Sequence, residues 1–81
     1  MQNELTENLD KLHTTPLGIE RIRRNCFPEC GDVVEWCRER ISEPEAAAAR
    51  YGKNWYVTSG DYVFTVNARS FTIITAHIRG R

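Results

Sequence analysis

The chain lacks long hydrophobic runs and the usual catalytic signatures. No apolar stretch approaches the roughly 18 residues that span a membrane, and residues 1–4 are polar, unlike a signal peptide. The sequence also contains no phosphate-cradling glycine loop, nucleophile elbow or metal-binding histidine pair. These absences predict a cytoplasmic protein with no membrane partner, and they leave its function to be argued from exposed surfaces.

The chain lacks an even number of cysteines, which argues against a secreted disulfide framework. The spacing of Cys26 and Cys30 resembles half of a zinc site. A structural site needs four ligands, however, and only Cys37, His13 and His77 remain as candidates. Cys37 also falls on the apolar stripe of a predicted helix. We therefore expect three reduced thiols, no bound metal and no cofactor.

The chain also lacks net charge, because eleven basic residues balance eleven acidic ones. The two signs are unevenly distributed along the sequence. Residues 50–81 contain a single acid, Asp61, and their basic residues are Arg50, Lys53, Arg69, Arg79 and Arg81. A local excess of positive charge attracts phosphates even on a neutral protein.

The C-terminal third is rich in β-branched and aromatic residues and predicts strands at 54–58, 61–67 and 71–78. The connections are too short for parallel crossovers, so the strands must be antiparallel neighbours. In the last strand, simple alternation predicts one face made by Phe71, Ile73, Thr75 and His77.

The N-terminal half predicts helices. Leucines at 5, 9 and 12 form an apolar stripe over residues 3–12. Thr15 as N-cap and Pro16 at the first helical position begin a second helix, which ends near residue 25. Asp32 and Glu35 resemble a capping box that begins a third helix, ending near residue 41.

Residues 45–50 are ambiguous. Their four alanines favour a short helix, whereas an edge strand here would complete a four-stranded sheet. We expect a single domain over residues 1–81, with a helical half at 3–42 and a sheet half at 46–78. The fold class is α+β, with two or three N-terminal helices packed on one face of a three- to four-stranded antiparallel β-meander. The predicted core is Leu9, Leu12, Ile22, Val34, Cys37, Trp55, Val63 and Ile73.

Two histidines are candidates for acid–base chemistry. His77 follows Thr75 and precedes Arg79 on the last strand, and arginine can stabilise charge on phosphate. His13 lies at a helix end, where the helix dipole favours a cation. On sequence alone, the plainer interpretations as a half-exposed strand-end residue and a helix-end residue carry more weight.

Basic and aromatic residues offer two further surfaces. Arg21, Arg23 and Arg24 form a helical cluster that suits either phosphate contacts or a solvated face. Aromatic residues interleaved with basic ones on a sheet can stack nucleic-acid bases, although large aromatics on strands more often belong to the core. Those near Arg50 and Lys53 are Tyr51, Trp55, Tyr56 and Tyr62.

Several segments, spread over nearly the whole chain, resemble a bacterial family of small proteins of unknown function. They are NLDKLHTT (8–15), LGIERI (17–22), VVEWC (33–37), GKNWYV (52–57), TVNA (65–68) and FTIITAH (71–77). This resemblance names a family without supplying an activity.

The order of elements, helices followed by a meander ending in a threonine-rich strand, is similar to the barnase–EndoU–colicin–RelE group. Members of that group are often ribonuclease toxins with catalytic groups on the open sheet face and neighbouring helices. The resemblance implies that Arg21 and Arg24 correspond to the arginines that members of the group carry on a helix. It also implies that Thr75 and His77 supply polar groups on the last strand. Small proteins of such families also travel on phages and mobile elements, where some inhibit host defence systems.

We therefore expect a small RNA-binding, RelE-like domain. A stronger form of this hypothesis is that the domain also cleaves RNA, as a metal-independent endoribonuclease of the toxin type. The alternative is a non-enzymatic phage or mobile-element protein that inhibits a host defence complex, as anti-CRISPR proteins do. A third option is a domain of metabolic context whose ligand the sequence does not indicate. The expected partners are RNA or a protein–RNA complex, and for a protein partner an antitoxin or a defence effector. The candidate catalytic residues are His13, His77, Arg21 and Thr75. The candidate nucleic-acid-binding residues are Arg24, Arg50, Lys53, Tyr56, Arg69 and Arg79.

Overall fold

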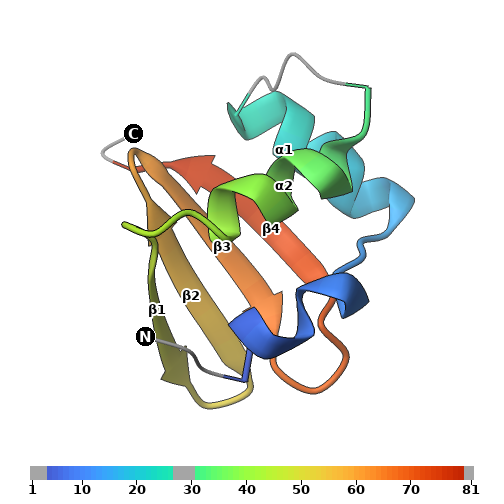
Figure 1. The fold of residues 1–81 in the computed structure, drawn as a ribbon. Coiled ribbons are helices and arrows are strands. Elements are labelled where there is room, and N and C mark those ends of the chain that lie inside the picture. The colour runs from blue at the N-terminus through green and yellow to red at the C-terminus, as the bar shows by residue number, and fades with distance from the viewer. Residues whose placement is uncertain (1–3, 27–30, 80–81) are drawn as a thin grey trace.

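The chain forms helices followed by an antiparallel sheet, as a computed structural model that describes residues 4–26 and 31–79 shows. The helical elements are the 3₁₀ helix η1 (Thr6–Lys11), α1 (Pro16–Cys26) and α2 (Val33–Ile41). The strands are β1 (Ala47–Tyr51), β2 (Asn54–Ser59), β3 (Tyr62–Asn67) and β4 (Ile73–Ile78). They pair in the order β1-β2-β3-β4, and the helices lie over one face of the sheet (Figure 1). The predicted α+β class is confirmed.

The helix starts follow the predicted caps. Thr15 Oγ1 accepts a hydrogen bond from the Gly18 N–H at 3.1 Å, and Asp32 Oδ1 accepts one from the Glu35 N–H at 3.0 Å. The first predicted helix is shorter and tighter than the leucine stripe suggested, because Asn8 interrupts it with a non-helical φ of −127°. None of the helices among residues 4–26 and 31–79 is long and apolar enough to cross a bilayer.

Residues 47–51 form edge strand β1, so of the two alternatives for residues 45–50 the structure shows the edge strand and not the short helix that the alanines favour. Ala48 lies opposite Val57, and the pairing continues to Tyr51 opposite Asn54. Alanine favours a helix by only a fraction of a kcal/mol per residue. An isolated helix of this length is marginal, and pairing with β2 outweighs the local preference.

A β-bulge in the last strand pair overturns the predicted face assignment of β4. Val66 pairs with Ile73, whereas its neighbour Thr65 pairs with Thr75, so Ile74 is the extra residue. The bulge lets Ile73 and Ala76 both point into the core. Thr75 therefore lies on the other face, which the helices leave open, and not on the face of Ile73.

The core lies between the helices and the covered face of the sheet. Five of the eight predicted core residues are buried: Leu12, Ile22, Cys37, Trp55 and Ile73. Leu9, Val34 and Val63 are only half-buried. Val63 pairs with Thr58 and His77 on the open face, where strand alternation places it.

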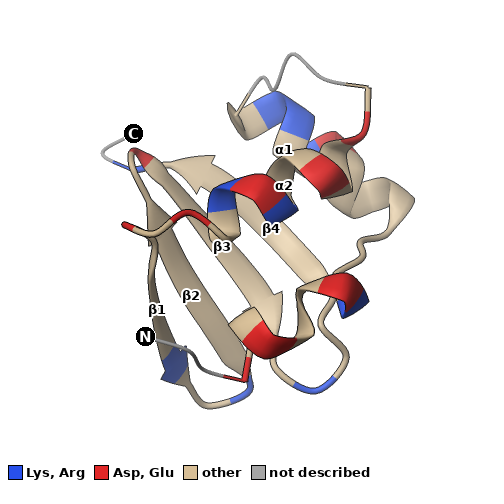
Figure 2. Cartoon of the chain, in the orientation of Figure 1, with Lys and Arg blue, Asp and Glu red and all other residues tan. Residues whose placement is uncertain are grey.

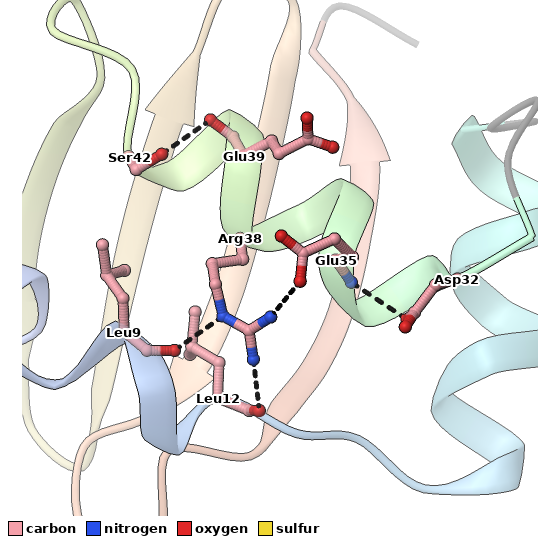
Figure 3. Close-up of polar contacts among 7 residues, drawn as sticks. All are labelled: Leu9, Leu12, Asp32, Glu35, Arg38, Glu39 and Ser42. Atoms are coloured by element: carbon pink, nitrogen blue, oxygen red, sulfur yellow. Dashed lines mark hydrogen bonds and ion pairs between the residues drawn. The ribbon is translucent and has the colours of Figure 1, made fainter.

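Arg38 of α2 fastens the N-terminal segment to the helical layer (Figure 3). Its Nε donates to the Leu9 carbonyl oxygen at 2.9 Å and its Nη2 to the Leu12 carbonyl oxygen at 3.4 Å, while Nη1 pairs with the Glu35 carboxylate. A guanidinium can meet three acceptors at once because its donors form a fixed planar fork. The segment leading to His13 is thereby held in place.

Candidate nucleic-acid interface

The β1–β2 turn brings a lysine to one end of the sheet. Tyr51 and Asn54 pair across the two residues Gly52 and Lys53, and Gly52 has a φ of 59°. Glycine at the first position of a two-residue hairpin turn supplies this positive φ without steric cost. The β3–β4 loop, residues 68–72, lies at the same end, because the Ala68 N–H donates to the Lys53 carbonyl oxygen at 2.8 Å.

These two connections enclose a recess of about 530 Å³, which we call the basic recess. Its lining residues are Arg50, Gly52, Lys53, Asn67 and Arg69. The three cations come from β1, the β1–β2 turn and the β3–β4 loop, and none of the lining residues is acidic. Figure 2 shows basic ribbon segments at these three places. The geometry suits a ligand with more than one negative charge.

Arg50 is positioned by two contacts. Its Nε donates to the Gly52 carbonyl oxygen at 3.0 Å, and its guanidinium carbon lies 5.9 Å from the centroid of the Trp55 ring. A cation over an aromatic face is held by the ring quadrupole. The remaining guanidinium donors stay near solvent, since Arg50 is exposed.

The β3–β4 loop is shaped by Asn67 and strained at Phe71. Asn67 Oδ1 accepts hydrogen bonds from the backbone N–H groups of Arg69 at 2.9 Å and Ser70 at 3.0 Å. Phe71 has a φ of 59°, a left-handed conformation that is unfavourable for a bulky residue. Burial of its ring and the hydrogen bond from its N–H to the Asn67 carbonyl oxygen hold it there. Strain of this kind is concentrated at functional loops.

A chain of side-chain hydrogen bonds links this loop to His13. Ser70 Oγ contacts Asn67 Oδ1 at 3.2 Å and Thr72 Oγ1 at 2.7 Å, and Thr72 Oγ1 lies 3.0 Å from His13 Nε2. The other ring nitrogen, Nδ1, lies 2.9 Å from the Lys11 carbonyl oxygen. His13 is therefore oriented at both nitrogens, and it lies beside Thr72, at the end of the sheet that carries the β3–β4 loop.

His77 and Thr75 lie away from the basic recess, on the open face. His77 pairs with Val63, close to the β2–β3 turn at the opposite end of the sheet. Four residues lie between it and Thr72, the hydrogen-bond partner of His13, and with Ile74 bulged out this corresponds to roughly 13 Å along a strand. The two histidines consequently do not flank a common position.

The other predicted site residues do not line the basic recess. Tyr56 is on the open face in the middle of the sheet, with its ring centroid 6.0 Å from that of exposed Tyr51. Arg21 and Arg24 are exposed on α1, which covers the opposite face. The Arg79 N–H donates to the Asp61 carbonyl oxygen beside the β2–β3 turn.

Sequence reasoning missed the polar residues that organise the recess: Asn67, Ser70 and Thr72. Their roles depend on the conformation of the β3–β4 loop. The one signal available was the Asn67 position between a strand and a small polar segment, which is typical of an Asx turn.

The cysteines Cys26 and Cys37 are both buried, and Cys30 lies outside the described residues. Burial raises the pKa of the Cys26 thiol from 9.0 to about 11, because the low-polarity surroundings disfavour the thiolate. Within residues 4–26 and 31–79, no three His, Cys, Asp or Glu side chains are grouped so as to hold a metal ion.

The comparisons with known proteins give a family without an activity. The chain matches the family described as "Protein of unknown function (DUF3781)" over residues 6–77, and it belongs to that family. No curated protein and no solved structure matches the chain.

Proposed function

We propose that this member of the DUF3781 family binds RNA, with backbone phosphates held in the basic recess. The observation that carries the proposal is the convergence of Arg50, Lys53 and Arg69 from three separate segments. Arginine and lysine supply most phosphate contacts in nucleic-acid complexes.

Aromatic surface next to the recess supports RNA over a small anion. Tyr51 directly follows Arg50 in β1, and the Tyr56 ring lies beside the Tyr51 ring on the open face. Unpaired bases stack on exposed tyrosine rings while the backbone follows a positively charged groove. A single-stranded segment would thus place its phosphates in the recess and a base over this tyrosine pair.

Cleavage would be a further step, and its candidate base is His13, which hydrogen bonds through Thr72 and Ser70 link to Asn67 at the recess. Once Nε2 is released from Thr72 Oγ1, it would take the proton from a ribose 2′-hydroxyl, whose oxygen attacks the adjacent phosphorus, while the recess cations stabilise the added negative charge. The bond from phosphorus to the 5′-oxygen then breaks, and that oxygen takes up a proton from the imidazolium. His77 is too remote to share this work.

The test is a titration of labelled single-stranded RNA at several salt concentrations. We expect K53A/R69A to lose affinity and to flatten the salt dependence by about one unit of slope for each cation removed. R23A/R24A is the matched control, since it removes the same charge from exposed positions on α1. If wild-type protein fails to bind at any salt concentration, or if both double variants weaken binding equally, the proposal is wrong.

A cleavage gel with the two histidine variants separates a nuclease from a binder. A nuclease of the kind described would lose turnover in H13A and keep it in H77A, with RNA binding retained in both. Binding without cleavage by the wild type would leave the RNA-binding proposal in place and favour an inhibitor or adaptor. Absence of RNA binding would leave the rival class, a protein that binds a defence effector or antitoxin, as the better account.

A further inference from the structure

Three polar contacts in a row join His13 to the β3–β4 loop. His13 Nε2 lies 3.0 Å from Thr72 Oγ1, which lies 2.7 Å from Ser70 Oγ. Ser70 Oγ in turn lies 3.2 Å from Asn67 Oδ1. The backbone fixes both ends of this chain, because the Ile73 N–H donates to the His13 carbonyl oxygen at 2.7 Å and the Asn67 N–H donates to the Thr72 carbonyl oxygen at 2.8 Å. The four side chains are thereby kept within reach of one another.

The number of hydrogens available to these three contacts depends on the charge of His13. Its Nδ1 lies 2.9 Å from the Lys11 carbonyl oxygen, which can only accept, so the ring hydrogen of a neutral imidazole is on Nδ1. At the other end of the chain, Asn67 Oδ1 can also only accept. In the neutral state the two hydroxyl hydrogens of Ser70 and Thr72 must therefore fill three contacts, and one contact lacks a hydrogen. Protonation of Nε2 supplies the missing one.

We propose that protonated His13 completes this chain and so fastens Arg69 at the basic recess, which makes RNA binding tighter at lower pH. In the imidazolium, Nε2 donates to Thr72 Oγ1, and the two hydroxyls then donate in turn toward Asn67 Oδ1. That oxygen also accepts the Arg69 N–H at 2.9 Å. His13, Thr72 and Ser70 are positioning residues, since none of them lines the recess. The inference rests on the proposed function for its ligand.

The expected pH range follows from the side chain that titrates. Histidine changes its charge between about pH 5 and pH 8. The charged side chains on the elements around His13 are Asp10 and Lys11 of η1, Arg38 of α2 and Arg69 of the β3–β4 loop. Within residues 4–26 and 31–79, none of these side chains is hydrogen-bonded to the imidazole ring. The ring is linked to the recess through the Thr72 hydroxyl.

An NMR pH titration of the free protein tests the hydrogen-bond chain without RNA. Thr72→Val removes the middle hydroxyl and keeps a β-branched side chain, and Ser70→Ala removes the next hydroxyl from an exposed position. In wild type the Arg69 amide signal should titrate together with the ring signals of His13. In both variants the ring should still titrate and the Arg69 amide should not. Thr58→Val, a half-buried threonine at the other end of the sheet, is the matched control and should behave as wild type. An Arg69 amide that still titrates in both variants would overturn the proposal.

RNA titration at about pH 5.5 and about pH 8 shows whether the chain acts on the recess. One additional hydrogen bond in the loop corresponds to roughly a two- to tenfold change in affinity. Acidification should therefore raise the affinity of wild type by that factor more than the affinity of Thr72→Val. The variant keeps the charge of His13, so the difference separates the hydrogen-bond chain from simple electrostatic attraction, and equal gains in the two proteins contradict the proposal. Absence of RNA binding by wild type at both pH values would overturn the proposed function, while the titration of the free protein still decides the chain.

Discussion

The two β-hairpin turns of the sheet have the same design and opposite charge. Each contains two residues with glycine first, Gly52–Lys53 at one end and Gly60–Asp61 at the other, and the glycines have φ values of 59° and 60°. The first turn meets the strained β3–β4 loop and contributes a lysine to the basic recess. The second lies beside the Arg79 backbone and contributes an aspartate.

The comparison shows that local geometry does not define the candidate site. What distinguishes the recess end is the neighbouring loop, where Asn67 and Phe71 hold Arg69 close to the β1–β2 turn. Variants that alter one end of the sheet and spare the other therefore separate the contribution of this loop from that of the turn.

The largest expected effect comes from removing the ring that holds the strained loop. Phe71→Ala should lower the free energy of unfolding by about 3–5 kcal/mol, since the buried ring is lost while the positive φ remains. Phe64→Ala, in the fully buried centre of the sheet, should cost a similar amount. Denaturant unfolding measures both losses of stability. RNA titration of the folded proteins should show weaker binding only for Phe71→Ala. Equal RNA affinities of the Phe71→Ala and Phe64→Ala proteins would contradict the claim that the β3–β4 loop shapes the RNA site.

Arg38→Ala should cost about 2 kcal/mol, because hydrogen bonds to charged groups are stronger than neutral ones. The change releases the Leu9 and Leu12 carbonyl oxygens and loosens the segment that carries His13. Hydrogen exchange should accelerate at the His13 amide more than at the Arg79 amide, which lies at the other end. Arg23→Ala removes the same charge from an exposed position and should change neither rate.

Gly52 and Gly60, the first residues of the two hairpin turns, allow the most closely matched comparison of the two ends of the sheet. Gly52→Ala and Gly60→Ala should each lower stability by about 1 kcal/mol, because both force alanine into a left-handed backbone while the added Cβ meets no atom within 4 Å. Thermal unfolding should show equal losses. RNA affinity should fall for Gly52→Ala and stay unchanged for Gly60→Ala. A loss of affinity in Gly60→Ala alone would place the RNA site at the β2–β3 turn and contradict the proposal.

The last expected effect is a pH dependence at the end of α1, which leaves stability at neutral pH unchanged. Because the folded-state pKa of Cys26 is raised to about 11 from 9.0, folding favours the protonated thiol. Its contribution to stability is complete below pH 9 and is lost as the pH rises from about 9 through 11. The stability difference between wild type and Cys26→Ala should narrow over this window, and a constant difference would refute the assignment.

The sequence was sufficient for most elements of the fold and for only part of the candidate site. Capping residues and strand composition are local signals, so α1, α2 and β2–β4 were predictable. The strand at 47–51 and the bulge at Ile74 were not, because pairing across the sheet determines both. The predicted cations at 50, 53 and 69 meet only because the β3–β4 loop folds back toward the β1–β2 turn. For the same reason no local pattern could separate them from Arg79.

The most direct test of the proposed RNA site is an NMR titration of isotopically labelled protein with single-stranded RNA. The account predicts that the amide signals of Gly52, Lys53, Arg69 and Ser70 shift together and saturate, and that those of Gly60 and Asp61 stay in place. Shifts concentrated at Gly60 and Asp61, or no shifts at either turn, would contradict it.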